Sequence, residues 1–232
     1  MTLTEHHQPS TLITGVGGSI GTAIIASLQT AGRSVITLSQ IGMSKGDLEA
    51  DFQDDGSLVD AVNRITLPLN GVVLAHGMLQ PGPLNRVSPS EWRSHLNVNL
   101  NSIYAILHTV VPKLKAEASI VVISSTAGLD HSPVGGPHYT VSKWALNGLV
   151  RHLASELGPL SIRINSVCPG WIDNPMGRAF LADADIQAGI SEIPLRRPGS
   201  ADEVASVVKF LLGSESSYMT GALVPVSGGY RY

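Results

Sequence analysis

The feature that most restricts the fold of this chain is an alternation of short, β-branched apolar runs with longer stretches of helical periodicity. The apolar runs are nearly continuous, which is typical of strands covered on both faces. Strands are predicted at residues 11–14, 34–38, 71–75, 119–123, 163–167 and 223–226. This alternation predicts an α/β fold in which one doubly wound parallel sheet is flanked by helices.

Two capping boxes mark where later helices begin. Ser88 and Glu91 form one, with Pro89 at the first helical position, and predict a helix that runs to about residue 111. Ser200 and Glu203 form the other and predict a helix that ends near residue 212. Because no internal repeat or linker interrupts the pattern, we expect residues 1–232 to form one domain, with residues 1–10 as a leader.

Composition excludes several classes of function. The chain has 15 basic and 18 acidic residues and a net charge of −3, which argues against nucleic acid as the main partner. The single cysteine, Cys168, excludes an internal disulfide framework, and we expect it to act as a small buried apolar residue. The histidines lack metal-ligand spacing, so no metal site is expected. The chain shows neither a secretory signal nor an apolar run near the roughly 18 residues of a membrane span, so we expect a cytoplasmic protein without membrane contact.

A glycine-rich loop, residues 14–21, follows the first predicted strand and precedes the first predicted helix. Glycines let a backbone turn tightly and approach a pyrophosphate, and a helix N-terminus supplies free N–H groups. This placement favours dinucleotide binding over a plain turn. The loop does not fit the common G-x-G-x-x-G pattern in register.

Tyr139 and Lys143 lie one helical turn apart and so share a helix face. An ammonium group close to a phenol favours the phenolate and lowers the pKa of the tyrosine. Tyr139 would then serve as a general acid or base near neutral pH. The alternative is a structural tyrosine whose lysine neighbour is solvated.

Several motifs, taken in order, resemble the short-chain dehydrogenase/reductase family from about residue 11 to 229. They are the loop at 14–21, Asn99, Ser125, the Tyr139-x-x-x-Lys143 pair and the tail Ser227-Gly228-Gly229. The resemblance implies a Rossmann-like sheet and an NAD(P)-dependent oxidoreductase that interconverts a carbonyl and a secondary alcohol by hydride transfer. Its substrate would be a small molecule.

The resemblance also implies catalytic roles. Tyr139 would give a proton to the carbonyl oxygen or take one from the hydroxyl, and Ser125 would hold that oxygen by a hydrogen bond. Lys143 would bind the nicotinamide ribose and lower the Tyr139 pKa. Asn99 would hold a water that relays protons to Lys143. Apart from the resemblance, His138 could touch the substrate because it is next to Tyr139, although a surface or hydrogen-bonded structural histidine is favoured.

The cofactor-binding residues implied by the resemblance extend over most of the chain. They are Gly15, Gly17, Ser19, Ile20, Gly21, Ser39, Asp51, Phe52, Ala75, Gly77, Tyr139, Lys143, Pro169, Gly170 and Ile172. The second strand ends at Ser39 and Gln40 without the carboxylate that usually selects NAD(H). Because Ser39 and Lys45 could contact a 2′-phosphate, we favour NADP(H), with NAD(H) as the alternative.

The chain departs from the family pattern at the phosphate loop and beside the third predicted strand. Ser19 replaces the middle glycine of T-G-x-x-x-G-x-G, and the string instead fits T-G-x-x-G-x-x-G of the family's extended branch. Leu-Ala-His-Gly at residues 74–77 stands where N-N-A-G is usual, so two asparagines that brace the sheet are missing.

Two spacings also differ from the family. The catalytic serine of the family usually lies 13 residues before the tyrosine, whereas Ser125 lies 14 residues before Tyr139 and Thr126 lies 13 before it. We choose Ser125 because it follows the strand end in the right register. Only 12 positions separate Ser39 from Asp51, so the helix after the second strand is predicted to be largely deleted.

Three further expectations concern the whole molecule. Residues 171–193 follow the nicotinamide pocket and are expected to form a substrate lid, or else two short helices packed on the body. The resemblance implies a homotetramer or dimer, built partly from the helices at 88–111 and 139–157. Two other functions stay open: an idle NAD(P)-binding regulator, and an epimerase or dehydratase that retains its cofactor.

Overall fold

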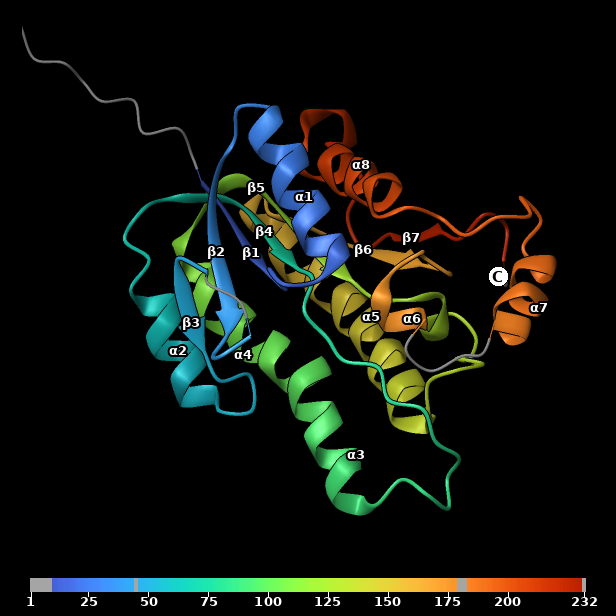
Figure 1. Ribbon diagram of the computed structural model, residues 1–232. Coiled ribbons are helices and arrows are strands. Elements are labelled where there is room, and N and C mark those ends of the chain that lie inside the picture. Colours follow the sequence, from blue (N-terminus) through green and yellow to red (C-terminus); the bar gives the residue numbers. More distant parts are fainter. Residues whose placement is uncertain (1–9, 44–45, 179–182, 231–232) are drawn as a thin grey trace, which may run out of the picture.

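The computed structural model describes residues 10–43, 46–178 and 183–230. It shows one parallel sheet with the strand order β3-β2-β1-β4-β5-β6-β7 (Figure 1). The strands are β1 (Ser10–Thr14), β2 (Ser34–Gln40), β3 (Leu48–Ala50), β4 (Leu69–Leu74), β5 (Leu114–Ile123), β6 (Arg163–Pro169) and β7 (Leu223–Val226). The order reverses direction between β1 and β4, and ligands of such sheets bind at the carboxyl ends of the strands beside this point.

Helices cover both faces of the sheet (Figure 1). Their bounds are α1 (Ser19–Thr30), α2 (Asp55–Asn63), α3 (Pro89–Leu96), α4 (Ser102–Val110), α5 (Pro137–Leu157), α6 (Pro175–Arg178), α7 (Asp183–Glu192) and α8 (Ala201–Leu212). Buried residues of α2, α4 and α5 form one apolar cluster with the sheet, and those of α1 and α8 form a second one. The predicted doubly wound α/β fold is therefore confirmed.

All of the predicted strands are present, and β3 is the strand that the sequence analysis missed. Its three residues pair with the end of β2. A run this short has no periodicity of its own, so only its pairing with β2 identifies it. Between β2 and β3, the described residues form no helix, which agrees with the predicted deletion.

Both capping boxes are formed, at Ser88 with Glu91 and at Ser200 with Glu203. The prediction of one unbroken helix at 88–111 is wrong, however. A π-helical turn, Asn97–Asn101, separates α3 from α4, and the Ser102 N–H reaches back five residues to the Asn97 carbonyl. Such turns change which face of a helix a residue occupies, and they are frequent at functional sites.

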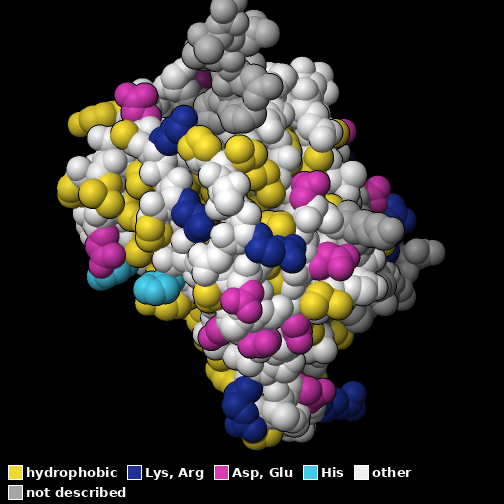
Figure 2. Space-filling view, turned by 90° about the vertical axis from the view of Figure 1, so that its left-hand side faces the viewer, with side chains coloured by type: hydrophobic (Ala, Val, Ile, Leu, Met, Phe, Trp, Pro, Cys, Tyr) yellow, Lys and Arg dark blue, Asp and Glu magenta, His cyan; other side chains and the backbone are white. Residues whose placement is uncertain are grey.

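The surface carries mixed charge. On the face shown in Figure 2, Lys and Arg side chains are interspersed with Asp and Glu and do not gather into one basic patch. Among the described residues, no helix is both long and apolar enough to cross a membrane.

Candidate active site

The glycine-rich loop after β1 leaves room for an anion at the N-terminus of α1. Gly15 has a φ of +79°, and a Cβ on it would lie 2.6 Å from the Ala75 backbone. A Cβ on Gly21 would lie 2.1 Å from the Gly15 carbonyl oxygen. The N-cap, Gly18, supplies no side-chain cap, and the first turn of α1 has no acidic residue. The first N–H groups of α1, from Ser19 onward, are therefore available to a pyrophosphate, so the loop fits a dinucleotide.

The end of β2 differs from our expectation for Ser39. This side chain is buried, and its hydroxyl donates to the Leu48 carbonyl and accepts the Gly46 N–H at 3.1 Å. Both hydrogen bonds of this hydroxyl are made within the protein. The predicted contact of Ser39 with a 2′-phosphate is therefore wrong in this structure. The other expected contact, Lys45, lies outside the described residues.

Gln40 joins the end of β2 to the segment expected beside the adenine. Its amide accepts the Phe52 N–H at 2.8 Å and donates to the Asp51 carboxylate at 3.3 Å. The Phe52 side chain is buried and meets the His76 ring edge to face, with centroids 4.4 Å apart. Asp51 and Phe52 are thereby held rigidly at the carboxyl edge of the sheet.

Tyr139, Lys143 and Ser125 come together at the ends of β5 and α5. The Ser125 hydroxyl hydrogen-bonds to Tyr139 and also accepts the Ala127 N–H at 3.1 Å. Lys143 is buried, with Nζ 5.7 Å from the centroid of the Tyr139 ring. Nζ donates to the Ile123 carbonyl at 3.0 Å. The alternative of a solvated lysine is excluded by this burial.

The pKa of Tyr139 does not move in the direction expected from Lys143 alone. Burial raises the pKa of this phenol, and the Ser125 hydrogen bond opposes the rise. Burial also lowers the pKa of Lys143 to about 8. The expectation of a lowered Tyr139 pKa is therefore wrong here, because the loss of hydration on burial outweighs the Ser125 hydrogen bond.

Asn99 is buried in the π-helical turn, directly beside this group. Its amide oxygen accepts the Met78 N–H and its amide nitrogen donates to the Met78 carbonyl, both at 2.8 Å. A Cβ on Gly77 would lie within 3.6 Å of both Asn99 Oδ1 and Lys143 Nζ. Asn99 therefore joins the segment after β4 to the helix that carries it, and it lies close to Lys143.

His76 takes over the bracing that the missing asparagines would have provided, and sequence reasoning did not foresee it. Its Nδ1 lies 2.6 Å from the Thr14 hydroxyl, and its Nε2 lies 2.8 Å from the Ser102 hydroxyl. Ser102 donates to the Val98 carbonyl at 2.7 Å, so it must accept from Nε2–H. Burial lowers the pKa of His76 to about 3, which keeps the ring neutral.

The other expected cofactor residues line the same edge of the sheet. Pro169 ends β6, and a Cβ on Gly170 would meet Ser227 at 2.7 Å. The Ile172 side chain is buried in the apolar cluster of α1 and α8, so only its backbone could face a cofactor. Ala75 follows β4 and touches the phosphate loop. Gly17 and Ile20 lie at the entrance to α1.

Two expectations concerned residues outside this set. Cys168 is buried, and burial raises the pKa of its thiol, as suits a small core residue. His138 is also buried and packs on His95, which agrees with the favoured structural role and leaves no contact with substrate in this arrangement. Among the described residues, no cluster of three or more His, Cys, Asp or Glu could hold a metal ion.

Comparison with known proteins agrees with this geometry. A family model described as enoyl-(acyl carrier protein) reductase matches residues 15–231. The chain belongs to the short-chain dehydrogenase/reductase family. It is 35% identical to 3-oxoacyl-[acyl-carrier-protein] reductase FabG of Pseudomonas aeruginosa, over 94% of this chain and 95% of the relative. It is 34% identical to an acetoacetyl-CoA reductase of Synechocystis, over 95% of each.

Solved structures of this family superpose closely. A blue fluorescent protein from a metagenomic library, in complex with NADPH, has a TM-score of 0.89 at 26% identity, over 96% of this chain and 97% of that one. A 3-oxoacyl-[acyl-carrier protein] reductase of Brucella melitensis with bound NAD has a TM-score of 0.83 at 29% identity, over 97% and 92%. As a short-chain dehydrogenase/reductase, the chain is an oxidoreductase that uses a nicotinamide cofactor and acts on a small molecule.

Proposed function

We propose that this enzyme reduces the carbonyl of a small molecule to a secondary alcohol, with Tyr139 as the general acid. The observation that carries the proposal is the Tyr139 phenol, which hydrogen-bonds to Ser125 beside the buried ammonium of Lys143. Relatives named as 3-oxoacyl-thioester reductases make acetoacetyl-CoA the first substrate to test.

Each residue of the site has a separate task in this reaction. Ser125 and Tyr139 hold the carbonyl oxygen, and Tyr139 gives it the proton that completes the alcohol. Lys143 supplies a positive charge beside the phenolate that results, which offsets part of the cost of burying that anion. The bound nicotinamide supplies the hydride. Asn99 keeps the segment after β4 in place against Lys143.

The test is Tyr139→Phe, which removes one oxygen and keeps the ring. We expect kcat to fall by about 10²–10⁴-fold while cofactor affinity and Tm stay near those of the wild type. The same change at the fully exposed Tyr218 is the control and should leave kcat unchanged. Near wild-type activity in Tyr139→Phe would refute the mechanism. A wild type that binds cofactor but turns over no carbonyl would instead favour the idle regulator.

For the cofactor, we propose a modest preference for NADPH. The supporting observation is that β2 ends in Gln40, whose amide is bonded to Asp51 and Phe52, so no carboxylate of β2 repels a 2′-phosphate. The same assay measures kcat/KM with NADPH and NADH at low ionic strength. A preference for NADH of about tenfold or more would contradict this proposal.

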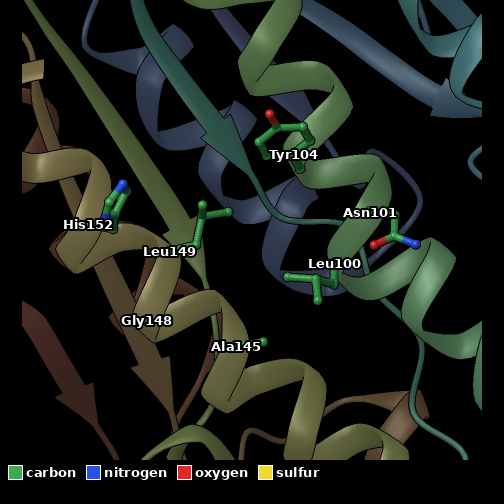
Figure 3. Close-up of a pocket in the computed structure, with 7 residues that line it drawn as sticks. All are labelled: Leu100, Asn101, Tyr104, Ala145, Gly148, Leu149 and His152. Atoms are coloured by element: carbon green, nitrogen blue, oxygen red, sulfur yellow. The ribbon is translucent and has the colours of Figure 1, made fainter. Parts of the chain in front are cut away.

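We also propose that a second copy of the chain packs on α4 and α5. A shallow groove between these helices is lined by Leu100, Asn101, Tyr104, Ala145, Gly148, Leu149 and His152 (Figure 3). Among these lining residues, Tyr104 is half exposed. Two of the lining residues that α5 contributes, Ala145 and Gly148, are small, so a partner helix could approach closely and remove the apolar lining from water.

The remaining proposals are a substrate lid and a location. Ile172 pairs with Gly199, and Trp171 packs on Gly189 of α7, so the base of the segment 171–193 is anchored beside the site. We propose that this segment, of which residues 179–182 lie outside the described residues, closes over the substrate. We keep the cytoplasm as the proposed location, which cell fractionation would test.

A further inference from the structure

Two buried histidines lie beside the site without a part in the mechanism above. His95 is on α3 and His138 is on α5, and both side chains are almost fully removed from solvent. Their ring centroids are 4.1 Å apart, with the planes tilted by 40°. The His95 ring also meets the Tyr139 ring edge to face at 6.0 Å. The pair thus lies between α3, which leads into the π-helical turn of Asn99, and α5, which carries Tyr139.

The hydrogen bonds of Asn99 determine the protonation state of His95. The two bonds with the Met78 backbone fix which end of the Asn99 amide is oxygen and which is nitrogen. The Asn99 nitrogen lies 2.8 Å from His95 Nε2 and can only donate to it. Nε2 therefore carries no proton, and the neutral ring of His95 has its proton on Nδ1.

Burying these rings is costly. Nδ1 of His95 and Nδ1 of His138 are both buried without a hydrogen-bond partner. An aliphatic side chain of similar size would fill the space between α3 and α5 without leaving such an atom unpaired. What the imidazole of His95 adds is the acceptor at Nε2.

We infer that His95 is a positioning residue, which holds the Asn99 amide in its working orientation through Nε2 and is itself kept in place by the His138 ring. It acts through Asn99 and touches neither substrate nor cofactor. This inference rests on the proposed function, because it needs Asn99 to serve the site around Lys143.

The charged groups around His95 keep its acceptor available. Burial, together with His138 and Lys143 of α5, lowers the pKa of His95 to about 4. Glu91, on α3, faces His138 and interacts with it electrostatically. At neutral pH the ring of His95 is therefore uncharged, and the Asn99 hydrogen bond leaves its Nε2 as the acceptor. Protonation would set an N–H of His95 against the N–H of Asn99 and end the hydrogen bond.

The direct test is the histidine tautomer, read from two-bond ¹H–¹⁵N spectra of protein labelled with ¹⁵N-histidine and assigned with the variant His95→Gln. We expect the Nδ1–H form for His95 and the opposite Nε2–H form for His76, which serves as an internal comparison. An Nε2–H form for His95 would overturn the inference. This outcome does not depend on activity, so it is separate from a failure of the proposed function in Tyr139→Phe.

The functional test compares His95→Leu, which removes the acceptor, with His95→Gln, which restores one. We expect kcat to fall about tenfold or more in His95→Leu, with cofactor Kd nearly unchanged, and to recover within about threefold of wild type in His95→Gln. If protonation of His95 lowers kcat of the wild type near pH 4, that decline should be absent in His95→Gln. The control is Arg93→Gln, which changes the exposed side of the same helix. Equal losses in both His95 variants would show a packing role only and would overturn the inference.

Discussion

At the scale of single residues, His76 shows how this enzyme replaces a missing motif. One imidazole joins the end of β1, through Thr14, to α4, through Ser102, although these residues are far apart in sequence. Thr14 also accepts the Ala75 N–H at 3.1 Å. The chain of hydrogen bonds therefore connects the phosphate loop to the helix that follows Asn99, but it works only while His76 is neutral.

This dependence predicts how stability changes with pH. The pKa of His76 is about 3 in the folded state, below the ordinary value of 6.5. The unfolded chain therefore binds more protons below pH 6.5, so this contribution to the free energy of unfolding is present above pH 6.5 and is lost as the pH falls toward 3. Between pH 7 and pH 5, the loss from His76 should be about 2 kcal/mol.

Urea denaturation at pH 7, 6 and 5 measures this loss. In His76→Asn the free energy of unfolding should fall less steeply across the range, although the variant is less stable at pH 7. The exposed His108→Asn variant should keep the wild-type slope. If wild type and His76→Asn lose stability in parallel, then His76 titrates normally and the hydrogen-bond chain is wrong.

At the scale of elements, the entry to α1 separates glycines that the fold needs from one that it does not. A Cβ on Gly21 would lie 2.1 Å from the Gly15 carbonyl oxygen, which is impossible without moving the loop. A Cβ on Gly18 would lie 3.5 Å from the same oxygen, an ordinary contact. Gly18 also has an extended backbone with φ near −85°, which any residue can adopt.

The substitutions Gly21→Ala and Gly18→Ala therefore form a matched pair. We expect Gly21→Ala to raise the cofactor Kd by about tenfold or more and to lower Tm, because the loop must shift away from α1. Gly18→Ala should change Kd by less than about threefold. Fluorescence titration with NADPH measures both. A large loss in Gly18→Ala alone would mean that the phosphate loop has another geometry when the cofactor is bound.

At the scale of the whole molecule, the groove between α4 and α5 predicts self-association. Light scattering at micromolar concentration should give two or four times the chain mass of 24.4 kDa. Gly148→Arg should reduce that mass, because it places a long charged side chain where a partner helix would pack. A Cβ at Gly148 meets no atom within 4 Å, and arginine favours helix more than glycine, so the folded monomer should tolerate the change.

The control for this prediction is Glu49→Arg, which lies on β3, away from α4 and α5. It should leave the mass unchanged. A wild type that scatters as a monomer would refute the proposed assembly. A Gly148→Arg protein with the wild-type mass would place the interface on another face.

The sequence by itself determined the elements whose signals are local. Continuous apolar runs specify buried strands, paired Ser and Glu specify the starts of α3 and α8, and Tyr139 with Lys143 marks one helix face. These patterns depend on neighbours within a few positions, so they can be recognised before the chain is folded.

Only the tertiary structure decided what depends on contacts between distant segments. β3 exists because it pairs with β2. The Ser39 hydroxyl is bonded within the protein because the shortened loop folds back and its Gly46 N–H donates to this hydroxyl. Burial raises the pKa of Tyr139 although Lys143 lies near it, because its environment is assembled from several elements. His76 became a brace because folding places Thr14 and Ser102 on opposite sides of its ring, and no local pattern carries that information.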